Sequence, residues 1–128
     1  KSKGRLELEQ VITQGMEFFC DDKIAVVWLT TEIMERFADK VDGEDFNGLA
    51  SLPRQVEGVL LGATVKQKGP TTFKVSVRTA EPINAGSVCA LVGGGGHARA
   101  AGCSIEGSIE FVRAKLLPVF EKALKANE

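Results

Sequence analysis

The chain has 128 residues, a length that supports one folded domain and is short for two. Hydrophobic residues make up 44% of the chain and charged residues 26%, so we expect a packed core and no long disordered segment. The formal net charge is −1, from 16 basic and 17 acidic residues. This balance excludes a protein that holds duplex DNA by neutralising many phosphates, and a polyanion would have to bind at a small local site.

The cysteines Cys20, Cys89 and Cys103 are odd in number and contain no C-x-x-C pair, which argues against a zinc site and a disulfide framework. We expect reduced thiols in a cytoplasmic protein. There is no signal peptide, and no apolar run approaches the length of a membrane span, so no membrane association is expected. The first residues, 1–4, include no methionine, and we expect the chain to be part of a longer protein.

Apolar spacing in the first half predicts a helix over residues 5–19 and then a buried strand over residues 24–29. The hydroxyl of Thr30 and the acid two residues later predict the start of another helix. A short helix is expected over residues 45–52 and should end before Pro53.

An antiparallel hairpin is predicted over residues 56–78. Residues 56–68 are rich in Val, Leu and Thr, and the sequence Lys-Gly-Pro-Thr over residues 68–71 is typical of a turn. Residues 73–78 then alternate between apolar and polar, so Lys74, Ser76 and Arg78 should share one face of the second strand.

The last third predicts a short helix over residues 84–91, a strand over residues 103–105 and a long amphipathic helix from Ser108. Pro118 should kink this last helix or delay its second half. The order of elements predicts an α/β fold in which a mixed β-sheet is flanked by helices in a single domain.

Four consecutive glycines, residues 93–96, precede His97, the only histidine. Ordering such a run costs backbone entropy, so it needs a reason. The run is either a flexible turn or a loop whose N–H groups approach an anion. The imidazole of His97 can donate to a phosphate, and the small residues 100–102 leave room for a ligand, which favours the second interpretation.

Two standard nucleotide loops do not fit this run. A P-loop requires Gly-Lys-Ser/Thr after its glycines, and a dinucleotide fingerprint requires a strand before them and a long helix after them. Arg78 is a further candidate because its guanidinium can bind a phosphate with two hydrogen bonds, although a solvated sheet face or edge is by itself the better explanation of this residue. Arg99 is a weaker candidate, since exposed arginines are common.

Residues 94–102 resemble the G-G-G-H-x-x-A-A-G signature of the DHH-associated domain, first subfamily, and residues 73–78 resemble its K-V-S-hydrophobic-R strand. The resemblance covers most of the chain. It implies that residues 1–128 are the C-terminal substrate-binding domain of a phosphoesterase. The catalytic DHH domain, with two manganese ions, would belong to another part of the polypeptide. The chain has no Asp-His-His motif, so we expect no catalytic residue, no metal or cofactor site and no hydrolysis by this chain alone.

Within this superfamily the chain is most similar to the bacterial oligoribonuclease/pAp phosphatase group, also called nanoRNases. These enzymes hydrolyse short RNA and 3′-phosphoadenosine 5′-phosphate (pAp). The alternatives are a domain from a single-strand exonuclease or cyclic-dinucleotide phosphodiesterase, a non-catalytic nucleic-acid or tRNA-binding module, and a structural or dimerising domain. The implied partners are short RNA or small nucleotide phosphates and the N-terminal DHH domain of the same polypeptide, with a homodimer of the whole enzyme as an option.

The resemblance also implies roles for individual residues. The amides of Gly94, Gly95 and Gly96 would cradle a phosphate, and His97 would contact the same phosphate or the scissile one. Arg78 would hold a terminal phosphate or a base. Small side chains would form the floor of the pocket. The full set of expected substrate-binding residues is Ser76, Arg78, Gly94, Gly95, Gly96, His97, Arg99, Ala100 and Ala101.

Overall fold

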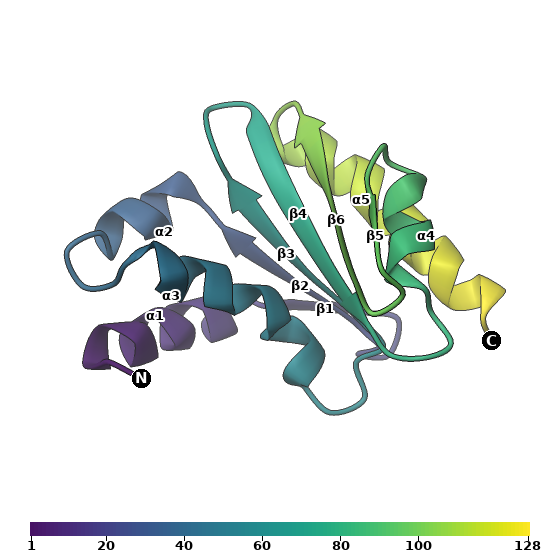
Figure 1. Cartoon of the computed structure of the whole chain (residues 1–128), viewed down its shortest axis with the longest axis horizontal. Coiled ribbons are helices and arrows are strands. Elements are labelled where there is room, and N and C mark those ends of the chain that lie inside the picture. Colours follow the sequence, from purple (N-terminus) through teal and green to yellow (C-terminus); the bar gives the residue numbers. More distant parts are fainter.

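A six-stranded mixed sheet with the order β1-β2-β3-β4-β6-β5 organises the computed structural model, which describes residues 1–128 (Figure 1). Its strands are β1 (Glu17–Phe19), β2 (Ile24–Leu29), β3 (Leu61–Gln67), β4 (Thr72–Thr79), β5 (Gly95–Gly96) and β6 (Ala100–Glu106). The helices are α1 (Lys3–Gln14), α2 (Thr31–Arg36), α3 (Gly43–Asn47), α4 (Ala85–Ala90) and α5 (Ile109–Ala126), with 3₁₀ turns η1 (Gly48–Ser51) and η2 (Pro53–Gln55). Strands β2 and β3 are parallel and the other neighbours are antiparallel, which confirms the predicted α/β fold.

The first helix is shorter than predicted. It ends at Gln14, and the N–H of Gly15 caps it by donating to the carbonyls of Val11 and Ile12. The chain then forms β1, which pairs with β2. The helical spacing of residues 16–19 was therefore misleading, because pairing with a neighbouring strand decided their conformation.

The segment between β2 and β3 also differs from the prediction. Helix α3 begins at Gly43, where the side chains of Asp42 and Asp45 each accept a hydrogen bond from the other's backbone N–H. Pro53 begins η2 instead of simply ending a helix. Strand β3 begins only at Leu61, and the preceding residues form a turn in which Gly58 has φ +89°.

Several local predictions are confirmed. Strand β2, the β3–β4 hairpin, the Thr30 cap of α2, the Asn84 cap of α4 and the start of α5 after Ser108 are present as expected. Strand β6 is longer than predicted, and the two-residue strand β5 within the glycine run was not foreseen. Helix α5 continues through Pro118.

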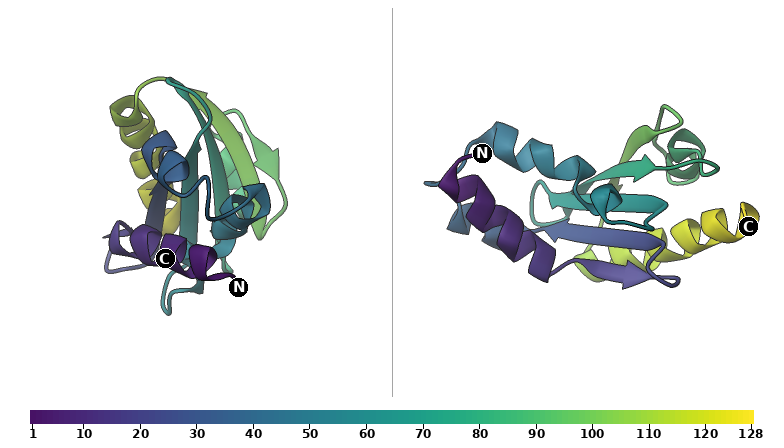
Figure 2. Two further views of the ribbon diagram at one scale, coloured as in Figure 1. Left: turned by 90° about the vertical axis from the view of Figure 1, so that its left-hand side faces the viewer. Right: turned by 90° about the horizontal axis from the view of Figure 1, so that it is seen from below.

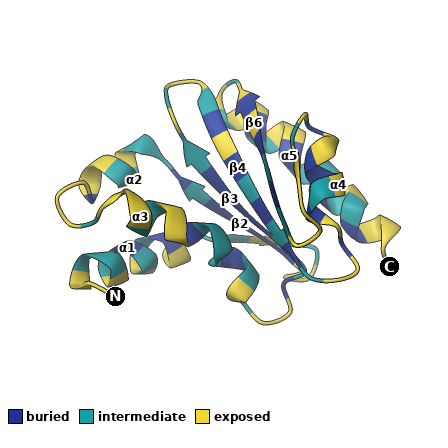
Figure 3. Cartoon of the chain, in the orientation of Figure 1, coloured by how far each residue is buried: buried dark blue, intermediate teal, exposed yellow.

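The two faces of the sheet are covered unequally. One face packs against α4 and α5 in a main core of 20 buried residues. The other face packs against α1 and η1 through a second core: Leu8, Ile12, Val27, Leu29, Phe37 and Leu49. Figure 2 shows α5 and the α3–η2 segment on opposite sides of the sheet. Among the strands, only β2 contributes to this second core, through Val27 and Leu29, and the residues of β4 and β6 on the same face remain half-buried or exposed (Figure 3). No helix in the structure combines the length and apolar character needed to cross a membrane.

Candidate functional site

The incompletely covered part of the sheet is the candidate site, and we call it the open face. Directly opposite residues on neighbouring strands point to the same side of a sheet. Arg78, Ser76 and Lys74 of β4 lie opposite Ala100, Gly102 and Ser104 of β6, and Gly95 of β5 lies opposite Gly102. The open face therefore consists of Lys74, Ser76, Arg78, Gly95, Ala100, Gly102 and Ser104. Three of these residues have no side chain or only a methyl group, so the backbone of β5 and β6 is bare beside Arg78 and Ser76.

The two polar groups that the sequence emphasised, Arg78 and His97, make no side-chain hydrogen bond or ion pair within the chain. Arg78 is half-buried and His97 is exposed at the tip of the β5–β6 hairpin. A partly buried guanidinium without a counter-charge is unfavourable until an anion or a partner group satisfies its five N–H donors. Arg78 is thus available to a ligand.

The backbone amides of the glycine run are less available than expected. The N–H of Gly94 donates to the carbonyl oxygen of Cys89 at 2.9 Å, and the N–H of Gly93 donates to Ala90 at 3.4 Å. The N–H of His97 donates to Ala100 at 2.8 Å. The expectation that Gly94 donates to a phosphate is therefore corrected, because its amide is already used to turn the chain after α4. The pair of His97 with Ala100 is hydrogen-bonded, and bonded pairs alternate along an antiparallel ladder, so the amide of Gly95 is used in its pair with Gly102 and only Gly96 remains as a candidate donor.

Packing explains most of the run. A Cβ on Gly94 would lie 2.1 Å from the carbonyl oxygen of Gly102, and a Cβ on Gly96 would lie 2.6 Å from Cα of Ala101. Gly93 and Gly96 also have φ values of +82° and +149°, which disfavour other residues. A Cβ on Gly93 or Gly95 would meet no atom within 4 Å. Close packing thus requires Gly94 and Gly96, the positive φ requires Gly93, and neither constraint applies to Gly95.

The N-terminus of α4 positions the hairpin tip. The N–H of Ala85 donates to Ala98 O at 2.7 Å, and the N–H of Gly86 donates to His97 O at 3.0 Å. The side chain of Asn84 accepts from Ser87 N at 2.9 Å. Helix-terminal amides can bind anions, but here they bind the loop that carries His97.

Thr79 and Arg99 fix the same loop from the other side. The buried hydroxyl of Thr79 lies 2.7 Å from Ile83 O and 3.0 Å from Ala98 O, and its N–H donates to Arg99 O at 3.1 Å. Arg99 Nη2 donates to Ile83 O at 2.6 Å. The guanidinium of Arg99 was expected to contact substrate, and in the structure it fastens the hairpin tip to the loop before α4. The role of Thr79 could not be predicted, because no neighbouring residue shows which carbonyls will surround its hydroxyl.

The two alanines of the signature point to opposite faces. Ala100 lies on the open face opposite Arg78, as the predicted floor of the pocket requires. Ala101 is buried in the main core, opposite Val77 and against Gly96. Its expected place in the pocket is corrected: the alternation of side chains along β6 directs only one of two consecutive residues to the open face.

Sequence reasoning missed three polar residues beside the open face. Gly62 of β3 lies opposite Arg78, and a Cβ there would be 2.6 Å from the backbone N of Arg54 in η2. Nε of Arg54 is buried without a hydrogen-bond partner. Further along, Lys66 of β3 donates to Asn47 Oδ1 at 3.3 Å, beside a cavity of about 40 Å³. The alternation of residues 62, 64 and 66 could have revealed a second polar strand face.

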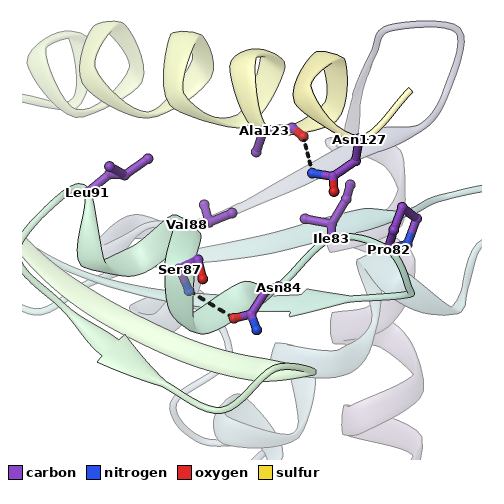
Figure 4. Close-up of a pocket in the computed structure, with 8 residues that line it drawn as sticks. All are labelled: Pro82, Ile83, Asn84, Ser87, Val88, Leu91, Ala123 and Asn127. Atoms are coloured by element: carbon purple, nitrogen blue, oxygen red, sulfur yellow. Dashed lines mark hydrogen bonds between the residues drawn. The ribbon is translucent and has the colours of Figure 1, made fainter.

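A larger cavity, of about 260 Å³, lies between α4 and the end of α5 (Figure 4). It is lined by Pro82, Ile83, Asn84, Ser87, Val88, Leu91, Ala123 and Asn127. None of these residues is charged. The side chain of Asn84 is bonded to Ser87 and that of Asn127 to Ala123, so the cavity offers little to a phosphate.

The cysteines beneath the glycine run are packing residues. Cys89 and Cys103 are buried, and the hydrogen bond with Cys103 together with burial raises the pKa of the Cys89 thiol. Burial also raises the pKa of Cys20. Raised pKa values disfavour the reactive thiolate. No group of three or more His, Cys, Asp or Glu side chains is placed to hold a metal ion, so we assign no metal-dependent step to these residues.

Comparison with protein families identifies this arrangement. The DHHA1 domain family matches residues 21–126. The chain belongs to the DHHA1 family. DHHA1 domains normally accompany an N-terminal DHH domain. A search of curated proteins gives no significant match.

Solved structures share the fold. An exopolyphosphatase-related protein from Bacteroides fragilis aligns with a TM-score of 0.78 and 27% identity, over 98% of this DHHA1 domain and 35% of that protein. The pGpG-specific phosphodiesterase PggH from Vibrio cholerae aligns with a TM-score of 0.60 and 15% identity, over 98% and 40%. The C-Ala domain of Aquifex aeolicus alanyl-tRNA synthetase gives 0.52 and 20%, over 81% and 94%. The chain thus spans less than half the length of the first two proteins.

Proposed function

We propose that this DHHA1 domain is the substrate-binding part of a DHH-family phosphoesterase of the nanoRNase type, which hydrolyses short oligoribonucleotides and small nucleotides such as pAp. The observation that carries the proposal is Arg78. Its guanidinium is half-buried, has no partner within the chain and lies beside the bare backbone of Ala100 and Gly102. The planar fork of an arginine matches the oxygens of a phosphate and binds them with two parallel hydrogen bonds.

The residues of the open face would bind and orient substrate. Arg78 would hold a phosphate with two hydrogen bonds, and the amide of Gly96 would approach the same anion. His97 would donate to a phosphate oxygen from the hairpin tip that α4, Thr79 and Arg99 hold in place. The DHH domain would supply a manganese-activated water for hydrolysis.

Charge and architecture support a small substrate. The net charge of −1 rules out broad phosphate neutralisation, and the cations on or beside the open face are few. Substrate pockets are common between domains, and a site on an uncovered sheet face would be completed by an adjoining DHH domain. The names of the pGpG-specific phosphodiesterase and the exopolyphosphatase-related protein both indicate phosphate chemistry. Reduced buried thiols suit the cytoplasm, which we propose as the location.

Calorimetric titration of the chain with pAp and with the dinucleotide pApA tests the proposal. Arg78→Lys keeps the charge and removes the fork, so we expect affinity for both ligands to fall about tenfold, which corresponds to about 1.4 kcal/mol. Arg36→Lys makes the same change on exposed α2 and serves as the control. Equal affinity in the Arg78 and Arg36 variants would show that the open face does not bind the phosphate. Affinity that keeps rising with RNA length would instead indicate a general RNA-binding module.

A further inference from the structure

Besides Arg78, two cations lie on the same side of the sheet as the open face, in the row beyond Ser76. Lys66 of β3 and Lys74 of β4 are directly opposite each other. Like charges in opposite positions destabilise a sheet. Burial and the charges of Lys68 and Lys74 lower the pKa of Lys66. Neither Lys66 nor Lys74 forms an ion pair in the chain.

Polar side chains and a small cavity surround this pair of lysines. Asn47, at the end of α3, accepts a hydrogen bond from Lys66 Nζ at 3.3 Å. Lys66, Lys74, Asn47 and Ser76 line the cavity of about 40 Å³ between the η1 segment and the sheet. Thr64 also lines it, but its hydroxyl donates to Leu49 O at 3.0 Å and is not free. In the next row of the sheet, Glu106 of β6 lies opposite Thr72 of β4. Its carboxylate accepts a hydrogen bond from the hydroxyl of Thr72 at 2.9 Å.

The separation of the lysines from Arg78 determines what could bridge them. Lys74 and Arg78 are four residues apart on one straight strand, which corresponds to about 13 Å along the strand. Asn47 holds the ammonium group of Lys66 toward α3, so its charge is not directed toward Arg78. The lysine pair thus lies two rows of the sheet beyond Arg78, and we expect the two groups to bind separate phosphates.

We propose that Lys66 and Lys74, with Asn47, form a second phosphate subsite, and that the open face takes a single-stranded, 5′-phosphorylated oligonucleotide of at least three nucleotides lying along β4. One phosphate would bind at Arg78 and another at the lysine pair, with the hydroxyl of Ser76 between them. This inference rests on the proposed function and narrows its substrate class. The two phosphates of pAp flank a single ribose and are too close together to reach both ends of the site, so an oligonucleotide should bind more tightly than pAp.

The test compares pAp with the trinucleotide pApApA in calorimetric titrations of the 128-residue chain. Lys66→Gln and Lys74→Gln each remove one charge, and Lys122→Gln on the exposed side of α5 removes the same charge elsewhere. We expect each of the first two variants to bind pApApA five- to tenfold more weakly and pAp unchanged. The slope of log affinity against log salt for pApApA should also fall by about 0.7 per lost contact. Lys122→Gln should behave as the unaltered chain.

The remaining outcomes of these titrations distinguish failure of the second subsite from failure of the proposed function. Equal weakening of pAp and pApApA in the lysine variants would mean that the lysines belong to a single anion site, which overturns the second subsite. Unchanged binding of both ligands in these variants, with weaker binding in Arg78→Lys, would also overturn it and leave the proposed function standing. If neither ligand binds and Arg78→Lys has no effect, both proposals fail.

Discussion

Alanine substitutions at two neighbouring glycines should have opposite consequences. In Gly94→Ala the new methyl would lie 2.1 Å from Gly102 O, 2.6 Å from Cys103 Cβ and 2.8 Å from Cys103 Cα. These distances are more than 0.5 Å shorter than an ordinary van der Waals contact, and two of the three atoms belong to the backbone of β6. Relief would require β6 to move relative to the turn after α4. Overpacking of this kind costs about 3 kcal/mol, the upper end of the usual range.

Gly95→Ala is the matched control, since a methyl there would meet no atom within 4 Å. The added Cβ restricts the unfolded chain, so stability should be unchanged or rise by about 0.5 kcal/mol. The methyl would, however, stand on the open face in the row of Ser76 and Gly102. We therefore expect Gly95→Ala to weaken nucleotide binding without destabilising the fold.

Urea and thermal unfolding of both variants, followed by titration with pApA, measure the two effects. Gly94→Ala should lower the melting temperature by roughly 10 °C, and Gly95→Ala should not lower it. A Gly94→Ala variant within about 0.5 kcal/mol of the unaltered chain would refute the packing reasoning. A Gly95→Ala variant with full affinity would refute its place in the site.

Four individual contacts support further predictions. Thr79→Val removes a buried hydroxyl that bonds the carbonyls of Ile83 and Ala98, each of which keeps a second donor, so urea unfolding should show a loss of about 1 kcal/mol. Because burial and nearby lysine charges lower the pKa of Lys66 in the folded chain, the unfolded chain binds more protons between the folded and unfolded pKa values. Unfolding free energy should therefore rise with pH through that window, which ends near the unfolded value of about 10.4, and Lys66→Gln should abolish the rise. Lys74→Gln relieves a like-charge pair and should stabilise the ligand-free chain by a few tenths of a kcal/mol, as calorimetric melting would show. Glu17→Ala removes the acceptor 2.6 Å from Trp28 Nε1, so the fluorescence of this single tryptophan should change and stability should fall by about 1 kcal/mol; unchanged fluorescence would contradict that contact.

The parts of the fold that the sequence predicted well are those determined by local chemistry. The apolar run of β2, the alternation in β4 and the side-chain caps Thr30, Asn84 and Ser108 depend on residues within one or two turns of the chain. Each has a local physical cause: burial on both faces, side-chain period, or satisfaction of free N–H groups.

The errors lie where distant strands determine the conformation. Residues 17–19 form β1 only because β2 is beside them, and Ala100 and Ala101 belong to β6 because they pair with Arg78 and Val77 of β4. Local spacing does not contain this information, so the first helix was extended too far and β6 was started too late. The same pairing sends Ala101 into the core.

The candidate residues of the site could be named from the sequence because they form one short signature and one strand, and their role in binding stays a prediction. The sequence placed Arg78, Ala100 and His97 in one region, but not the acceptors that occupy the amide of Gly94 or the guanidinium of Arg99. The neighbouring polar groups come from α3, η2 and β3, and only sheet register and helix packing bring them to the open face.

The most direct test of the central claim is an NMR titration of the chain with pAp and pApA, in which backbone amide shifts are followed residue by residue. We predict shifts centred on Gly95, Gly96, His97 and the β4 residues around Arg78, with none around the cavity of Leu91 and Asn127, and their loss in Arg78→Lys. Absence of shifts at millimolar ligand, or shifts centred on the α4–α5 cavity, would contradict the assignment of the open face as a preformed phosphate site.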